Sequence, residues 1–291
     1  MKRKIFKYIG LGLLAVLALL LGGYFLVKRS VHNRTTQKYA FATERLHVPS
    51  DSATLARGRH LVAIKGCQDC HGQDLAGKVL NDDGALGRLV ATNITSGKGG
   101  LAQDYTTDDW VRALRHGVDK TGRPLLLMPS QETTLLSAED LGAVIAYCQQ
   151  VPAVDNPLPA NSLGPLGVLL THFDKIPLLS VEKIDHTQPM LARADTTEGV
   201  AMGKYLAVSC SGCHRPDFKG GEPVVPGQPP VPDLTSAGHI GKWTQEQFIQ
   251  TLRTGKTPAG HQMNNENMPW KMTAQYEQKE LASLYQYFRS L

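Results

Sequence analysis

The chain has 291 residues, enough for one large domain or two domains of ordinary size. Its composition, with 42% hydrophobic and 20% charged residues, is that of a globular protein and excludes wholesale disorder. The formal charge of +5 comes from the N-terminus, because residues 1–38 hold eight of the 31 Lys and Arg and no acid, which leaves 23 bases against 26 acids. A body with a net charge of −3 does not indicate a nucleic-acid-binding surface.

The N-terminal segment contains an uncharged run of 19 residues, from Ile9 to Val27. As a helix rising 1.5 Å per residue it spans about 28 Å, close to the hydrocarbon core of a bilayer. The basic residues before the run outnumber Lys28 and Arg29 directly after it, so the N-terminus is expected in the cytoplasm and the rest in the periplasm. A cleaved signal peptide is the alternative, but the small-x-small sequence Ala40-Phe41-Ala42 lies 13 residues beyond Val27. We therefore expect an uncleaved single-pass anchor in a bacterial inner membrane.

Four of the five cysteines form two CxxC pairs, and a histidine directly follows each pair. The motifs are Cys67–His71 and Cys210–His214. CxxCH is the attachment signal for c-type haem, in which both thiols add to vinyl groups and the imidazole reaches the iron from the same side. Cysteines at positions i and i+3 and a histidine at i+4 lie on one helical face, which explains the spacing.

The alternatives are a Cys₄ zinc site made from both pairs, or two redox-active disulfides. Neither alternative explains why a histidine follows each pair. We therefore predict two covalently bound haem c groups. The predicted attachment residues are Cys67, Cys70, Cys210 and Cys213, and the predicted proximal iron ligands are His71 and His214.

The two motifs lie in two copies of one repeated unit. The corresponding segments are Gly58–Leu61 and Gly203–Leu206, Asp74–Gly77 and Asp217–Gly220, Asn93–Thr95 and Asp233–Thr235, and Asp108–Gly117 and Glu246–Gly255. Each half closes with a predicted amphipathic helix, at residues 138–150 and 275–290. We expect the closing helix to cross the first helix of its half, with Gly58 or Gly203 permitting close approach to an aromatic ring. Ordinary helix breaks at these glycines are the alternative.

A haem iron needs either a sixth ligand or an open site, and this choice separates an electron carrier from an enzyme. Met128 is the only methionine between Met1 and Met190, and a proline follows it. Met268 is the only methionine of the second half that is followed by proline, and its offset of 140 from Met128 equals that of the closing helices. A lone methionine is usually core packing, but the repeated Met-Pro predicts Met128 and Met268 as axial iron ligands.

Taken together, CxxCH, Asn93–Thr95, the helices ending in Arg-x-Gly and the Met-Pro pairs resemble a known family. It comprises the membrane-anchored c-type cytochromes related to the cytochrome subunits of bacterial alcohol and gluconate dehydrogenase complexes. The likeness covers about residues 50–291 and implies an all-α fold, with two tandem class I cytochrome c-like haem domains after the transmembrane helix. Those dehydrogenase subunits typically carry three such domains and this chain carries two, so it looks like a cousin of them.

The connector between the halves is rich in proline and shows no long helical period. Its many apolar residues predict that it lies against one or both domains. The predicted organisation is 1–38 for the basic end, anchor and spacer, 39–151 for the first cytochrome c domain, 152–189 for the connector, and 190–291 for the second cytochrome c domain.

Three smaller predictions concern residues outside the motifs. Cys148 corresponds to Phe288 in the other half, so we expect a buried apolar residue and not a reactive thiol. His172 and His186 lie in the connector and are expected to be structural or exposed. Residues 81–87 are expected to form a polar loop.

The sequence thus predicts a dihaem electron carrier with no catalytic residues, which relays single electrons in a periplasmic respiratory chain. Its expected partners are the membrane and a redox protein donor and acceptor, a periplasmic dehydrogenase among them, with no nucleic acid. The alternative is a dihaem enzyme, such as a peroxidase or a thiosulfate dehydrogenase, which would need one iron with a vacant site or an unusual ligand. A haem-based sensor or assembly subunit is a third class, for which the sequence has no discriminating motif.

Overall fold

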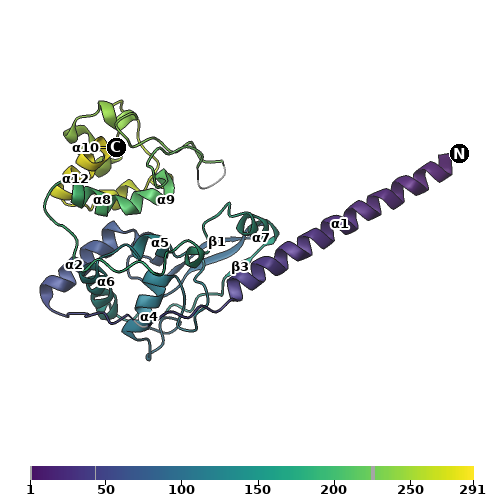
Figure 1. Ribbon diagram of the computed structural model, residues 1–291, viewed down its shortest axis with the longest axis horizontal. Coiled ribbons are helices and arrows are strands. Elements are labelled where there is room, and N and C mark those ends of the chain that lie inside the picture. Colours follow the sequence, from purple (N-terminus) through teal and green to yellow (C-terminus); the bar gives the residue numbers. More distant parts are fainter. Residues whose placement is uncertain (1, 43, 224–226) are drawn as a thin grey trace.

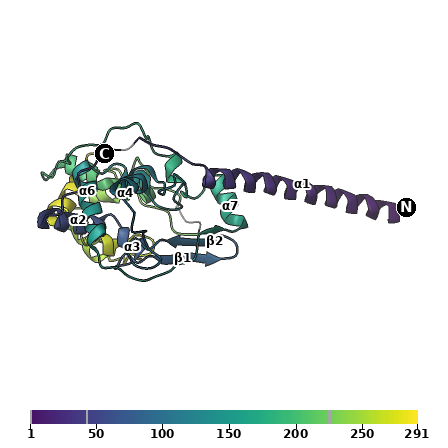
Figure 2. The same cartoon turned by 90° about the horizontal axis from the view of Figure 1, so that it is seen from below.

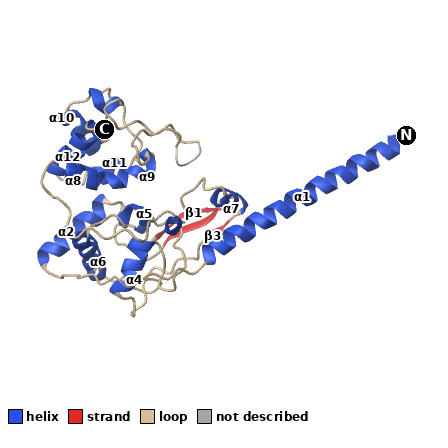
Figure 3. Cartoon of the chain, viewed as in Figure 1, coloured by secondary structure: helices blue, strands red, loops and turns tan. Residues whose placement is uncertain are grey.

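The computed structural model describes residues 2–42, 44–223 and 227–291. One long helix, α1 (Lys2–Thr36), projects from a body of two helical domains that lie against each other (Figures 1 and 3). Its apolar side chains are exposed over most of its length, as at Leu19 and Leu20. By length and composition α1 is able to cross a membrane, and a signal sequence near an N-terminus meets the same criterion.

The first domain is made mainly of short helices around an apolar core. They are α2 (Ser52–Ile64), α3 (Cys67–His71), α4 (Thr107–Val111), α5 (Ser130–Thr133) and α6 (Ala138–Gln150). α4 continues into a π-helical turn, η1 (Arg112–His116). α2 begins at Asp51, whose carboxylate accepts hydrogen bonds from the backbone N–H groups of Ala53 and Thr54.

The second domain repeats this order of helices. It contains α8 (Val200–Ala207), η3 (Val208–Cys210), α9 (Ser211–His214), η4 (His239–Lys242), α10 (Gln245–Thr254), α11 (Trp270–Thr273) and α12 (Gln278–Arg289). α12 begins three residues later than predicted, because Glu277 and Glu280 form a capping box at its start. Gly117 and Gly255 end the corresponding helices of the two halves in left-handed conformations, with φ of 69° and 71°.

In each domain the closing helix crosses the first helix at a glycine. A Cβ added at Gly58 would collide with the carbonyl oxygen of Ala143 in α6 and lie 2.8 Å from Cβ of Tyr147. A Cβ at Gly203 would collide in the same way with Ser283 in α12 and lie 2.7 Å from Cβ of Tyr287. The predicted close approach is therefore confirmed in both halves, and the glycines are not ordinary helix breaks.

The expectation of an all-α fold is wrong for the first domain, which carries a small antiparallel sheet in the order β1-β2-β3 (Figure 2). The strands are β1 (Lys78–Asp83), β2 (Gly87–Ala91) and β3 (Ser162–Leu163). The predicted polar loop at residues 81–87 is instead the end of β1 and a tight turn. Asp83 closes this turn by accepting hydrogen bonds from the N–H groups of Ala85 and Leu86, at 2.8 and 2.7 Å.

The connector packs against the first domain, as its apolar residues predicted. Leu127 donates a backbone hydrogen bond of 2.9 Å to Leu178, and β3 pairs with β2. The connector also forms one helix that the proline count did not predict, α7 (Pro165–His172), followed by the turn η2 (Ser180–Glu182). Proline is tolerated at the first position of α7, because that N–H has no partner within the helix.

Candidate haem-binding sites

The attachment motifs lie on short helices directly after the first helix of each domain. Cys67 and His71 are the first and last residues of α3, whereas Cys210 ends η3 and His214 ends α9. After each histidine the chain makes the same turn. Its carbonyl accepts a hydrogen bond from the N–H of a glycine six residues later, at 2.7 Å in the first domain and 3.1 Å in the second. The repeat seen in the sequence is therefore a repeat of backbone geometry.

Both motif histidines are held by a backbone carbonyl on the Nδ1 side. Nδ1 of His71 lies 2.8 Å from the carbonyl oxygen of Thr92, and Nδ1 of His214 lies 2.9 Å from that of Pro232. Such a bond places the proton on Nδ1 and leaves the lone pair of Nε2 for a metal. Each imidazole is thus oriented to bind iron through Nε2, which is the role that the motif predicts.

Burial sets the protonation of the same residues. It lowers the pKa of His71 and of His214, and the hydrogen bonds from Nδ1 to the carbonyls oppose this only in part. Burial also raises the pKa of the Cys67 and Cys210 thiols to about 12. Near pH 7 the two imidazoles are therefore neutral, the form that binds a metal, and these sulfurs are neutral thiols before any haem is attached.

Met128 and Met268 occupy equivalent loops. The N–H of Ser130 donates to the Met128 carbonyl at 2.8 Å, and the N–H of Trp270 donates to the Met268 carbonyl at 2.7 Å. The prolines that follow the methionines share one conformation, with φ and ψ of −79° and 55° after Met128 and −74° and 65° after Met268. Both methionines are half-buried. This equivalence supports the prediction of axial ligation, which stays a prediction.

These donors fit haem c and not the alternative groups. In each half two thiols, a neutral imidazole and a thioether belong to one repeated arrangement. Within residues 2–42, 44–223 and 227–291, no group of three or more Cys, His, Asp or Glu side chains is placed to hold a metal ion directly, so the two CxxC pairs do not form a Cys₄ zinc site. The five cysteines are also free of disulfides.

The two domains meet through a pair of reciprocal polar contacts. Tyr205 of α8 donates a hydrogen bond to Asp140 of α6 at 2.8 Å, and His60 of α2 lies 2.8 Å from Glu280 of α12. Tyr205 and His60 hold the same place in the repeat, as do Glu280 and Asp140. The interface is therefore close to two-fold symmetric, although it joins two halves of one chain.

The same interface brings each domain to the attachment motif of the other. The Glu132 carboxylate, in α5, comes so near Gly212 of the second motif that a Cβ on this glycine would lie 2.6 Å from Oε1. The sulfur of Met272, in α11, would lie 3.2 Å from a Cβ on Gly66, directly before the first motif. Glu132 and Met272 are related by the offset of 140. The two attachment motifs therefore face the same interface.

Sequence reasoning missed this interface and the charges within it. Burial raises the pKa of Glu132 to about 7, and the nearby ammonium group of Lys65 offsets only part of this effect. Burial likewise lowers the pKa of Lys65. No local motif marks either residue. Asp140 and Glu280, in contrast, could have been found, since both are acids at the same position of the two closing helices.

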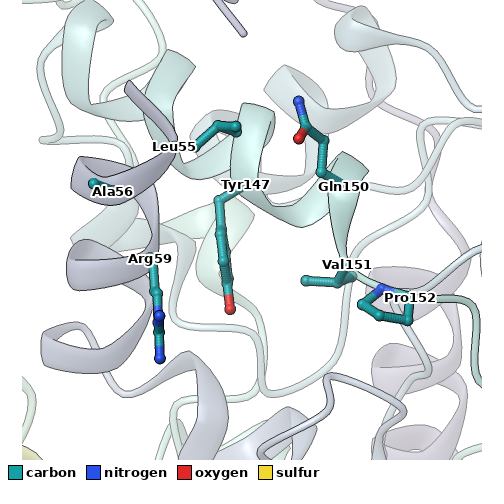
Figure 4. Close-up of a pocket in the computed structure, with 7 residues that line it drawn as sticks. All are labelled: Leu55, Ala56, Arg59, Tyr147, Gln150, Val151 and Pro152. Carbon is teal, nitrogen blue, oxygen red and sulfur yellow. The ribbon is translucent and has the colours of Figure 1, made fainter. Parts of the chain in front are cut away.

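The remaining residues of interest lie outside the attachment motifs. Cys148 is 5% exposed in the apolar core, as predicted. His186 is structural, with its Nδ1 3.0 Å from Nδ1 of the buried His116. A pocket of about 360 Å³ opens beside the crossing of α2 and α6, where Tyr147 lies between Arg59 and Val151 (Figure 4). None of the residues lining this pocket belongs to an attachment motif.

Comparison with known protein families identifies the class of both domains. The family model for cytochrome c matches residues 200–291, and the model for cytochrome c oxidase, cbb3-type, subunit III matches residues 53–148. Each domain therefore matches a family model of the cytochrome c type, and domains of this type carry covalently bound haem c. Helices make up most of the regular secondary structure of the two domains, with the small sheet as an addition to the first.

Several individual relatives of the chain are cytochrome subunits of dehydrogenases. The chain is 27% identical over 240 residues to the alcohol dehydrogenase (quinone) cytochrome c subunit of Gluconobacter oxydans, covering 71% of this chain and 48% of that protein. It is 28% identical over 253 residues to the fructose dehydrogenase cytochrome subunit of Gluconobacter japonicus, covering 76% and 49%. The gluconate 2-dehydrogenase cytochrome c subunit of Pantoea cypripedii is 27% identical over 241 residues, with 71% and 52% covered.

The predicted resemblance to the cytochrome c subunits of dehydrogenase complexes is thereby confirmed. The chain spans about half the length of these relatives. By name they are cytochrome subunits of dehydrogenases, which agrees with the predicted electron carrier.

Proposed function

We propose that this chain is a membrane-anchored dihaem cytochrome c that relays single electrons at the periplasmic face of a bacterial inner membrane. The donor is a dehydrogenase and the acceptor is a downstream redox protein. The observation that carries the proposal is the duplication of the whole ligand arrangement. In both domains the CxxCH histidine is held by a carbonyl through Nδ1, and a Met-Pro loop of the same conformation precedes the closing helix.

The residues of each domain supply two thioether attachments and two axial ligands. Haem iron supplies one-electron exchange between Fe(III) and Fe(II). His71 and His214 would hold the iron through Nε2, and Met128 and Met268 would each supply a thioether as the second protein ligand. A thioether ligand favours Fe(II), so both centres have fairly high reduction potentials. An iron held by both an imidazole and a thioether would have no site open to peroxide or thiosulfate, which favours a carrier over an enzyme.

The interface between the domains supports a relay within one chain. Each attachment motif is approached by a side chain of the other domain, Glu132 at Gly212 and Met272 near Gly66. Redox groups attached at these two motifs would therefore be held near one packed interface, not at opposite ends of the body. The relatives, which are subunits of alcohol, fructose and gluconate dehydrogenases, support a dehydrogenase as the donor.

Two features support the proposed location. The apolar run of α1 is uncharged over a length that spans a bilayer, and the basic residues concentrate before it. The body, of net charge −3, then lies on the outer side. In the oxidising periplasm, the four motif cysteines would be protected from forming disulfides once they are bound to haem as thioethers.

Haem content is tested by the mass of the denatured full chain, produced in cells with a working cytochrome c assembly system. We expect the polypeptide plus two haems. Cys213→Ala should impair attachment only in the second domain, and Cys70→Ala only in the first. Cys148→Ala, the matched control outside the motifs, should keep both haems. An unmodified wild-type mass would refute the proposal.

The choice between carrier and enzyme is tested by spectra of the reduced protein with and without carbon monoxide, and by turnover with hydrogen peroxide and thiosulfate. We expect negligible carbon monoxide binding and negligible turnover, together with rapid electron exchange with a small redox mediator. Rapid carbon monoxide binding at either haem, or turnover near ~10 per second, would establish an enzyme instead.

A further inference from the structure

Helix α7 is a part of the connector that packs against the N-terminal helix, and Arg34 of α1 donates a hydrogen bond of 3.0 Å to its Thr171 carbonyl. It is also packed against the sheet of the first domain. A Cβ added at Gly167 would collide with the carbonyl oxygen of Leu86, which lies between β1 and β2. The buried face of α7 consists of Gly167, Val168 and Thr171. α7 is therefore fixed to the first domain on one side and to α1 on another (Figures 1 and 2).

The contact with α1 lies at the end of the apolar run. α1 is exposed over most of Ile9 to Val27, is half-buried at Tyr24 and Val27, and is buried at Val31. These three positions follow one another at helical spacing and share one face of α1. At 1.5 Å per residue, Val31 lies only about 6 Å beyond Val27. α7 therefore lies at the level where the apolar run meets the polar part of the chain.

The face of α7 turned away from the body is apolar. Leu166 is 43% exposed and Phe173, directly after the helix, is 61% exposed. Leu169 and Leu170 are half-buried between them. A short helix with an exposed leucine and phenylalanine, placed where a membrane span ends, has the properties of an interfacial helix.

The charges around α7 suit the same environment. Arg34 of α1 pairs with Asp174, just after α7, at 2.7 Å and with Glu182 of η2 at 2.5 Å, so this one cation offsets part of the negative charge of the two acids. Lys175 directly follows Asp174 and is exposed, as are Lys28 and Arg29 at the end of the apolar run. Cations at this level attract anionic lipid headgroups.

We propose that α7 lies in the membrane–water interface, with Leu166 and Phe173 inserted at the boundary between headgroups and acyl chains. This inference rests on the proposed anchoring of α1. The occupant of the exposed face is the lipid of the same bilayer that α1 spans. The first domain is then attached to the membrane at two points, α1 and α7, and is held in one orientation instead of swinging on a single tether.

The test is photocrosslinking of the full chain in cells. A benzophenone amino acid replaces Phe173 in one variant, Leu19 in the middle of α1 in a second, and Val200 at the start of α8 in a third. These positions are exposed by 61%, 76% and 45%. After irradiation, the mass of the labelled peptide shows whether a phospholipid has been added. Unchanged haem spectra show that each variant folds.

We expect a lipid adduct at positions 173 and 19 and none at position 200. An adduct at 19 without one at 173 would overturn the interfacial helix while leaving the anchor intact. No adduct at 19 would show that α1 is not an anchor, and the inference would fall with it. A polypeptide adduct at 173 would identify a protein partner in place of lipid and would also overturn the inference.

Discussion

Tyr205, in the second cytochrome c domain, donates a hydrogen bond of 2.8 Å to Oδ2 of Asp140 in the first. The N–H of Ser137, at the start of the closing helix, in turn donates to the Tyr205 hydroxyl at 3.1 Å. The hydroxyl thus joins the first helix of one domain to the closing helix of the other. His60 and Glu280 make the reciprocal contact, so the domains are held by two versions of one contact and not by the connector alone.

Removing the hydroxyl should weaken the interface without disturbing either domain core. Tyr205→Phe keeps the ring but removes two hydrogen bonds, one of them to a carboxylate. We expect the free energy of unfolding to fall by about 1–3 kcal/mol. The measurement is denaturant or thermal unfolding of the full chain carrying its haem groups.

Tyr287→Phe is the matched control for this change. Tyr287 lies on the closing helix of the second domain, and among the described residues its hydroxyl has no hydrogen-bond partner. This variant should unfold like the wild type. Equal stability of Tyr205→Phe and Tyr287→Phe would show that the contact contributes nothing.

The Glu280 contact makes the interface sensitive to acid. Burial by itself would favour the neutral acid, but the hydrogen bonds from His60 and from the N–H of Glu277, with the charge of Arg57, lower the pKa of Glu280 overall. A lowered folded-state pKa adds stability above the unfolded value of about 4.5, and this stability is lost as pH falls through the folded-state pKa.

We therefore expect Glu280→Gln to be less stable than wild type at pH 6, with the difference shrinking as the pH falls below the unfolded value and through the lowered folded-state pKa of Glu280. Unfolding measured across this range checks the prediction. Glu266→Gln, at an exposed position in the same domain, should follow the wild-type curve throughout. A constant difference between wild type and Glu280→Gln at every pH would contradict the assigned role of the carboxylate.

The helix crossings should tolerate no side chain at their glycines. Gly58→Ala and Gly203→Ala each place a methyl group against a carbonyl oxygen of the closing helix. The two helices would have to move apart to admit the methyl group and would lose van der Waals contacts with each other. We therefore expect the free energy of unfolding to fall by about 1–3 kcal/mol. Gly84→Ala, in the open turn between β1 and β2, has no atom within 4 Å of the new group and should change little. Equal stability of all three variants would show that the crossings are not close-packed.

Much of each site could be predicted, because it depends on short-range spacing repeated twice. Three features recur in the second half at a nearly constant offset. They are the CxxCH motifs, the Met-Pro pairs, and Gly58 and Gly203 in the first helix of each domain. Equal geometry at His71 and His214, each bonded to a carbonyl 18 to 21 residues later, shows that the repeat extends to the surroundings of the ligands. A repeat makes these residues easy to recognise, because each position in one half can be compared with the equivalent position in the other half.

What could not be predicted depends on contacts distant in sequence. The sheet needs β3, which lies 71 or more residues after β2 and supplies only a two-residue strand. The position of Glu132 beside the second motif depends on how the domains dock, and nothing around residue 132 indicates it. The same holds for α7. The many prolines of the connector suggested irregular chain, but the short leucine-rich helix α7 is stabilised by its contacts with α1 and the sheet.

The identity of the axial ligands gives the last prediction. Met128→His and Met268→His should each keep a six-coordinate iron while lowering the reduction potential of the haem in that domain. The physical reason is that imidazole donates to Fe(III), whereas a thioether favours Fe(II). Redox titration with spectroscopic detection follows the two potentials, and each variant should shift one of them and leave the other nearly unchanged.

Met263→His is the control for the second domain, because Met263 is half-buried near the same loop but is not followed by proline. It should leave both potentials near their wild-type values. If Met128→His and Met268→His moved neither potential, the thioether assignment would be wrong in both domains. If instead Met263→His alone lowered a potential, Met263 and not Met268 would be the ligand of the second haem, and the equivalence of the two Met-Pro loops would be structural only.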